Sequence, residues 1–314
     1  MQAKDHDETI STIMAMRQQE HKTYFCETSC HGENDRPPMD DETSSSSSSA
    51  GVDATTPKTR QIFCDWCYKI VDFCELDREL VEIAMNHVDR FVQTEKGRST
   101  LRDASRYQML VVTALYTSVK TNSEFAISIK QFERISRDCF TAKDLEEMER
   151  LLLEVLQWHM NPPTSLSFVR LFLDLIPKQS MNQDLRDTAY ILARIQTELS
   201  VFDSRSISAK SSTIAFASLM NSFEVLGLLE TLSGSAAVQS FVSKAASLGL
   251  VDTQLFYTEG LLASIQARLY QAIANQENPT SCVGQNGSKA PSRRGVARNK
   301  SFEESPRSVI SRTA

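Results

Sequence analysis

The sequence predicts an all-α protein, and two observations lead to that class. Glycine and proline are sparse, 10 and 9 of 314 residues, which disfavours both the many tight turns of an all-β chain and glycine-rich nucleotide-binding loops. Apolar residues also recur three or four positions apart through most of residues 59–275. With 41% hydrophobic and 24% charged residues the chain can bury real cores, and its length suggests two domains.

Five helices are predicted in the first unit, residues 59–160. A stripe that includes Ile62, Trp66 and Ile70 predicts a helix over about residues 58–74. Asp77 stands at an N-cap position ahead of a second amphipathic run, residues 78–92. The other three are expected over residues 103–120, from Ser128 onward, and from the cap Thr141 to the helix-stopping Asn161-Pro162-Pro163-Thr164.

A second unit, residues 161–275, repeats this count. Its amphipathic segments cover residues 165–176, 183–202, 206–226, 235–249 and 252–274. The two units are of similar length and show no obvious identity in sequence. The sequence therefore predicts two consecutive five-helix domains of one fold, joined at a hinge of Asn161, Pro162 and Pro163.

The two ends lack the residues that a core needs. Residues 1–58 hold 11 acids and 5 bases and include an acidic, serine-rich stretch, so we expect a disordered regulatory segment. A short helix through Ile10 and Met16 is possible there, although nothing nearby would bury it. Residues 276–314 are expected to form a disordered basic tail, since residues 275–314 hold 7 bases and 3 acids. The overall charge of −6 leaves −4 for the middle of the chain.

Several classes of function find no support in the sequence. No run of about 18 apolar residues and no signal-like N-terminus occur, so we expect an intracellular protein without membrane contact. Seven cysteines, an odd number, indicate free thiols, and Cys64 and Cys67 form a CxxC that fits core packing better than a metal or redox site. The five histidines accompany no catalytic signature, so neither an enzyme nor a cofactor is predicted.

Four motifs of the first unit, in order, resemble the cyclin box of the cyclins. Arg60–Trp66 resembles the opening M-R-x-I-L-x-D-W, and His87–Phe91 resembles Y-I-D-R-F. Leu115–Lys120 resembles L-L-A-S-K, and Leu145–Arg150 with Leu156–Trp158 resembles the fifth helix of the family. The resemblance implies two cyclin folds, of which the second is divergent. It also implies that Arg60 and Asp89 form a structural ion pair.

The resemblance implies a regulatory subunit that binds and allosterically activates a cyclin-dependent kinase in cell-cycle control, in the nucleus or cytoplasm. In this family a lysine and a glutamate at the positions of Lys120 and Glu149 grip the regulatory helix of the kinase. A lysine can donate to free helix carbonyls, and a glutamate can accept backbone N–H groups. The same kinase-facing surface would include Thr117, Thr121, Leu153, Trp158 and Met160.

A second site implied by the resemblance is a cleft for R-x-L peptides of kinase substrates. It would be lined by Ile62, Phe63, Trp66, Tyr107 and Gln108. Lys69 stands where the family has an acid and would repel the arginine of such a peptide. Thr56 and Ser305, each before a proline, are candidate phosphorylation sites.

One alternative stays open on the sequence. A cyclin-fold scaffold, such as transcription factor IIB or a retinoblastoma-type pocket, binds transcription machinery, DNA or peptides without activating a kinase. Binding to nucleic acid needs a basic face, which the net −4 of the middle segment disfavours.

Overall fold

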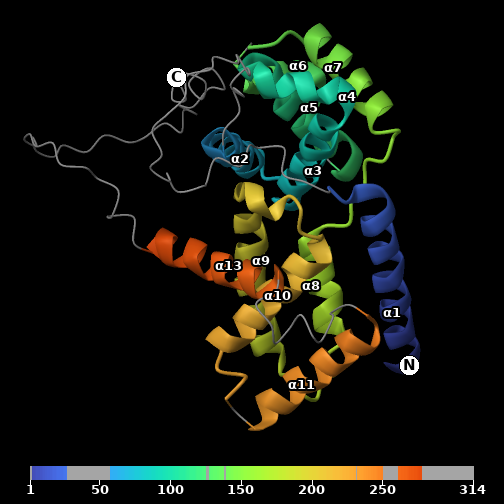
Figure 1. Cartoon of the computed structure of the whole chain (residues 1–314), viewed down its shortest axis with the longest axis vertical. Helices are drawn as coiled ribbons and strands as arrows, with labels where there is room; N and C mark the ends of the chain where they lie inside the picture. Colours follow the sequence, from blue (N-terminus) through green and yellow to red (C-terminus); the bar gives the residue numbers. More distant parts are fainter. Residues whose placement is uncertain are drawn as a thin grey trace, which may run out of the picture.

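The computed structural model describes residues 2–26, 57–124, 127–137, 139–230, 232–249 and 261–277, and within these ranges every regular element is helical. Figure 1 shows two helical units with the N-terminal helix running beside the second. The first unit contains α2 (Pro57–Phe73), α3 (Glu79–Gln93), α4 (Glu95–Arg98), α5 (Ala104–Asn122), α6 (Ile129–Ile135) and α7 (Ala142–Val155). The second contains α8 (Ser165–Asp174), α9 (Gln183–Phe202), α10 (Ser211–Val225), α11 (Leu232–Ser247) and α13 (Leu261–Glu277). The all-α prediction is confirmed.

Local capping fixes where the helices of the first unit begin. The carboxylate of Asp103 accepts the N–H groups of Ser105 and Arg106 at the start of α5. Ser128 ahead of α6 and Thr141 ahead of α7 each form a capping box with the residue three positions on. The expected helices are therefore found within a few residues of their predicted limits, and the short α4 is an addition that the sequence pattern did not indicate.

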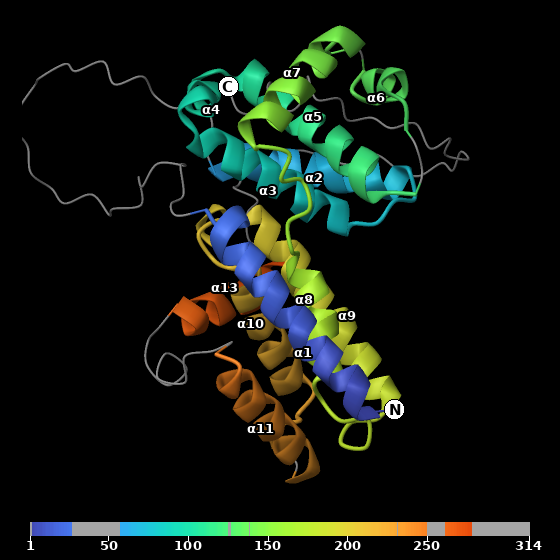
Figure 2. The same ribbon diagram turned by 90° about the vertical axis from the view of Figure 1, so that its right-hand side faces the viewer.

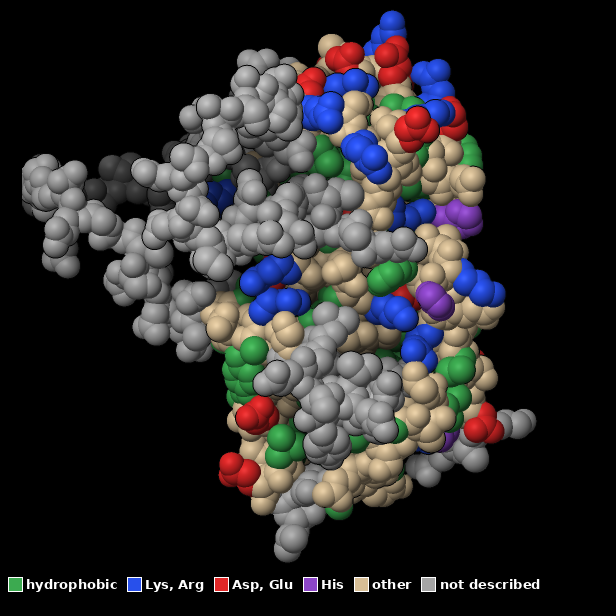
Figure 3. Space-filling model, in the orientation of Figure 1, with side chains coloured by type: hydrophobic (Ala, Val, Ile, Leu, Met, Phe, Trp, Pro, Cys, Tyr) green, Lys and Arg blue, Asp and Glu red, His purple; other side chains and the backbone are tan. Residues whose placement is uncertain are grey.

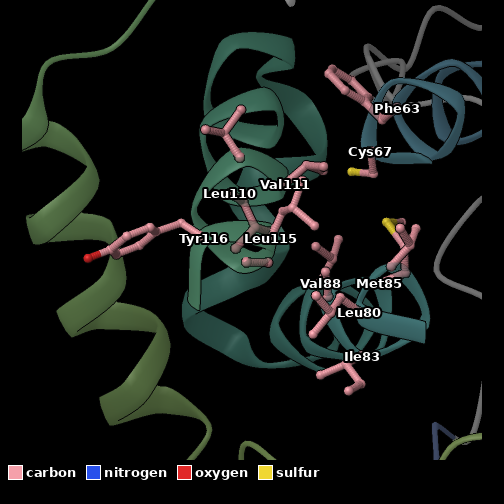
Figure 4. Close-up of a cluster of buried hydrophobic side chains, with 14 of the residues drawn as sticks. Phe63, Cys67, Leu80, Ile83, Met85, Val88, Leu110, Val111, Leu115 and Tyr116 are labelled. Carbon is pink, nitrogen blue, oxygen red and sulfur yellow. The ribbon is translucent and has the colours of Figure 1, made fainter. Parts of the chain in front are cut away.

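The core of the first unit surrounds α5. Twelve of the thirteen positions from Tyr107 to Val119 in this helix, all except Met109, are buried, as expected of a central helix. Figure 4 shows Leu110, Val111 and Leu115 of α5 facing Leu80 and Val88 of α3. Because α5 is covered on nearly every side, it holds Lys120, near its C-terminal end, in a fixed place.

The CxxC lies inside this core. The thiols of Cys64 and Cys67 are free and fully buried in α2. Burial raises the pKa of Cys64 to about 12 and that of Cys67 well above its usual value. Both thiols are therefore neutral at physiological pH and act as packing groups.

The N-terminal segment differs from our expectation of disorder over residues 1–58. Gln2–Gln19 form α1, which continues as a π-helical turn over Glu20–Tyr24. Ile13 is fully buried in the core of the second unit, so a partner for this helix does exist. Both views place α1 alongside α8 (Figures 1 and 2). The rest of the expected disordered segments, residues 27–56 and 278–314, lies outside the described residues.

Two half-buried acids of α3 join the two units where the chain passes from α7 to α8. Glu82 of α3 accepts the N–H of Ser165 at 2.7 Å, which caps the first turn of α8. Glu79, one turn earlier, contacts Thr164, accepts the hydroxyl of Ser167 at 2.7 Å, and pairs with Arg170. Carboxylates are favourable at helix N-termini, so the first unit supplies the cap that α8 needs.

A third acid, which is buried, comes from the N-terminal segment. Glu20 accepts both the N–H and the hydroxyl of Ser212 at 2.7 Å, in the first turn of α10. Burial raises the pKa of Glu20 and also that of Glu82, which reaches about 7. The second unit is therefore held at two helix starts by residues that precede it in the chain.

Candidate functional site

Lys120 and Glu149 lie in direct contact at the edge of the first unit. The Nζ of Lys120, in the last turn of α5, is 3.1 and 3.2 Å from the two carboxylate oxygens of Glu149 in α7. The glutamate side chain is 11% exposed, whereas the lysine side chain is 52% exposed. The pair therefore offers an anchored carboxylate and an accessible ammonium, the two signs of charge that the free ends of a partner helix can engage.

Two aromatic rings, those of Tyr116 and Phe132, pack next to this pair. The Nζ of Lys120 lies 5.6 Å from the ring centroid of Tyr116, one helical turn earlier. That ring packs edge-on against Phe132 of α6 at 5.5 Å, and Figure 4 shows Tyr116 projecting from α5 away from the main cluster. A cation held over a ring gains stabilisation, so three helices position one ammonium group. Tyr116 was not among the residues predicted for this surface, because the family pattern carries a different residue type at its position.

The other residues expected on the kinase-facing surface divide into two groups. Trp158 is 73% exposed, Thr121 is exposed and Leu153 is half-buried. Thr117 and Met160 are buried, at 1% and 6% exposure, so their side chains do not lie on the surface described here. For these two the expectation of a surface position was wrong, because α5 is enclosed on nearly all faces and Met160 is enclosed by the core of the first unit.

The segment after α7 presents Trp158 by an unusual backbone. Gln157 and Trp158 both have positive φ, at 51° and 61°, a region that residues with side chains rarely adopt. The Trp158 N–H donates to the carbonyl oxygen of Leu153 at 3.0 Å. The αL turn thereby ends α7 and directs an indole ring into solvent.

A buried histidine holds the next part of the chain. Nε2 of His87 in α3 lies 3.0 Å from the carbonyl oxygen of Met160. Burial lowers the pKa of His87 to about 4, so the ring is neutral at physiological pH and its Nε2–H donates to that carbonyl. His87 therefore has a structural role in this site.

The residues expected to line an R-x-L cleft lie together but are closed over. Phe63, Trp66, Tyr107 and Gln108 are at most 2% exposed, and Ile62 is half-buried. The rings of Phe63 and Tyr107 pack at 5.6 Å, which fills the space of an open cleft. The lining residues are thus covered in this structure, and peptide docking at this position stays a prediction.

Unused hydrogen-bond donors remain at that closed position. Trp66 Nε1 and Gln108 Nε2 are buried without an acceptor among the described residues. Because buried donors are nearly always paired, these two side chains keep unused hydrogen-bonding capacity inside the first unit. Lys69 lies on the exposed side of α2 and pairs with Asp65 at 2.8 Å.

The structural ion pair inferred from the motifs is present. Arg60 binds both carboxylate oxygens of Asp89, and the two side chains are 3% and 8% exposed. Beside it, a cavity of about 70 Å³ between the units is lined by Arg60, Glu82, Asn86 and Asp89 among others. The candidate phosphorylation sites Thr56 and Ser305 lie outside the described residues.

The described ranges show neither a metal site nor a membrane-spanning helix. They contain no group of three or more His, Cys, Asp and Glu side chains placed to hold a metal ion. None of the helices found there has the length and apolar character needed to cross a lipid bilayer.

Comparison with known proteins gives consistent matches. Residues 27–161 match the family "Cyclin, N-terminal domain". The chain is 22% identical to the G1/S-specific cyclin-E1 of Danio rerio over 57% of its own length and 43% of that protein. It is 25% identical to the human G1/S-specific cyclin-D1, over 41% of this chain and 42% of that protein. The matched region thus spans less than half of each relative.

A solved structure, a viral cyclin from herpesvirus saimiri, matches with a TM-score of 0.45 and 17% identity, covering 62% of this chain and 87% of that one. The match to the family domain spans the ordered motifs of α2, α3, α5 and α7, and the relatives named by sequence are cyclins. Residues 27–161 of the chain therefore carry a cyclin N-terminal domain.

Proposed function

We propose that this chain is a regulatory subunit that binds a cyclin-dependent protein kinase and activates it allosterically. The observation that carries the proposal is the Lys120–Glu149 pair. It combines a mostly buried carboxylate with an exposed ammonium group at one edge of the cyclin domain. The relatives matched in sequence are named as G1/S-specific and G2/mitotic-specific cyclins, which favours a role in the cell cycle.

The proposed action uses binding energy to shift a conformational equilibrium of the kinase. The ammonium of Lys120 would donate to carbonyl oxygens at the end of the kinase's regulatory helix, and Glu149 would accept N–H groups of the adjoining loop. Trp158, Leu153 and Thr121 would add contact around the pair. A kinase helix held inward places its glutamate against the ATP-binding lysine and opens the activation loop.

We also propose that substrate peptides dock near α2. The two unpaired donors, Trp66 Nε1 and Gln108 Nε2, support this, since an extended peptide supplies backbone carbonyls. Docking there requires the Phe63 and Tyr107 rings to separate. Lys69 on the same helix sets the preference against basic peptides.

The alternative of a DNA-binding scaffold has less support. On the face shown in Figure 3, basic and acidic side chains are intermixed over the first unit and form no continuous basic surface. A protein that neutralises several phosphates needs clustered lysine and arginine residues.

The test replaces Lys120 and Glu149 together by alanine. The desolvated kinase groups would lose their charged partners, so affinity for the co-expressed kinase and its activity on a histone peptide should fall about 30-fold or more. The matched control is Lys96→Ala with Glu154→Ala, an exposed pair at 2.7 Å on the same domain, which should change affinity little. A double variant that melts normally and still activates its kinase fully would overturn the proposal.

A further inference from the structure

The turn that presents Trp158 is fastened on one side by α3. Besides the His87 contact to Met160, Nη1 of Arg90 donates to the carbonyl oxygen of His159 at 2.8 Å. Two consecutive carbonyls after Trp158 are thus fixed by side chains one turn apart on the same helix. A backbone with two adjacent positive φ values persists only where its surroundings hold it, and these bonds are part of that hold.

Tyr24 covers the other side of the same turn. Its ring meets the ring of His159 edge-on, with centroids 6.3 Å apart and planes at 90°. The guanidinium of Arg90 lies 4.8 Å from the centroid of the Tyr24 ring, and Nδ2 of Asn86 donates to the Tyr24 carbonyl oxygen at 3.3 Å. Arg90 is thus shared, because its face stacks on Tyr24 while its Nη1 holds His159.

Tyr24 is itself anchored to the second unit. It ends the π-helical turn that begins with Glu20, and Glu20 is bound to Ser212 at the start of α10. One turn of chain therefore connects a buried anchor on the second unit with the residue that supports the Trp158 turn. Ile13, fully buried, fixes the preceding helix to the same unit.

We propose that Tyr24 is a positioning residue for Trp158: through Arg90 and His159 it holds the turn that presents the indole ring to the partner. The docked N-terminal segment then controls how well the partner surface is formed, and its release would loosen that surface without removing any contact residue. The role in partner binding rests on the proposed function above. The positioning of Trp158 does not, and it can be measured on the chain alone.

Tryptophan fluorescence gives that measurement. The chain has two tryptophans, and Trp66 is 1% exposed whereas Trp158 is 73% exposed, so iodide quenches essentially Trp158 alone. Tyr24→Ala should raise the iodide quenching constant of the Trp158 emission by about twofold, because the turn that carries the ring gains freedom. The fluorescence anisotropy of the same emission should fall. Tyr24→Phe keeps the ring on Arg90 and His159 and should leave both values unchanged.

Kinase binding gives the second reading. Tyr24→Ala should weaken binding of the co-expressed kinase by about tenfold, with Tyr24→Phe near the parent value. Tyr190→Ala is the matched control, since this half-buried tyrosine also faces an arginine, Arg170 at 5.9 Å, but lies on the second unit. The control should alter neither the quenching of Trp158 nor kinase binding.

Two outcomes decide the matter. Trp158 emission that is unchanged in Tyr24→Ala, with a normal melting curve, overturns the inference whatever the kinase assay gives. Should Tyr24→Ala melt early, Tyr24→Leu fills the volume without an aromatic ring, and the same rise in quenching is expected from it. A failure of the Lys120 and Glu149 test would instead overturn the proposed function and leave the fluorescence result standing.

Discussion

Arg60 and Asp89 form a buried two-bond ion pair, Nη1–Oδ1 at 2.5 Å and Nη2–Oδ2 at 2.9 Å, that joins α2 to α3. The Nε–H of the same guanidinium donates to the carbonyl oxygen of Val201 in α9 at 3.0 Å. One arginine of the cyclin motif therefore stabilises the first unit internally and also binds it to the second.

Replacing Arg60 by alanine should lower the free energy of unfolding by about 3–5 kcal/mol, because Asp89 stays buried without its partner. Urea denaturation measures this. Arg194→Ala is the control: its pair with Glu198 spans one turn of α9 and is 44% exposed on the arginine side, so about 0–1 kcal/mol is expected. Equal losses in the two variants would contradict a special role for the buried pair.

Glu82 makes stability depend on pH in an unusual direction. Burial raises its pKa from 4.5 to about 7 in the folded chain, so the folded state binds a proton more tightly than the unfolded state. This contribution to stability is complete below pH 4.5 and is lost as the pH rises toward 7, by up to about 3 kcal/mol. His87, with a pKa lowered to about 4, acts in the opposite direction, since its contribution is lost as the pH falls from 6.5 toward 4.

Glu82→Gln isolates the first of these effects. Glutamine can still accept the Ser165 N–H but does not titrate, so the variant should gain stability relative to the parent as the pH rises from about 4.5 to 7. The measurement is the difference between the two unfolding free energies across that range. A difference that stays constant with pH would show that Glu82 does not titrate there.

Lys69→Glu should improve binding of a fluorescent R-x-L peptide by about threefold or more at low ionic strength, since an acid would replace the base beside Asp65. High salt should remove the gain. Lys143→Glu changes the net charge equally on α7 and serves as the control. If both variants bind the peptide alike, the docking position on α2 is wrong.

The helices of both units were predictable because their signals are local. Apolar spacing and cap residues such as Asp103 and Thr141 act within a few positions of each helix start. α1 was underestimated for the opposite reason. Its apolar residues form a weak stripe, and the surface that buries Ile13 comes from helices more than 150 positions away.

The candidate site was predictable only in part. Motif spacing brought Lys120 and Glu149 together, because each position is fixed by the register of its own helix. Burial of Thr117 and closure of Phe63 on Tyr107 depend on how neighbouring helices pack, which a pattern of residues does not encode. Tyr24 belongs to no motif, and its contacts with Arg90 and His159 depend on how the N-terminal segment packs against the first unit.

The acids that cap α8 and α10 all precede those helices in the chain, with Glu20 standing 192 positions ahead of Ser212. During synthesis on the ribosome the caps are therefore made before the helices that require them, and the second unit can fold against a surface that is already in place. The capping residues are always synthesised first and the helices that they cap second. In a nascent chain without its first twenty residues, folding would be affected only when α10 emerges, because the Ser212 N–H would then lack the Glu20 carboxylate as its acceptor.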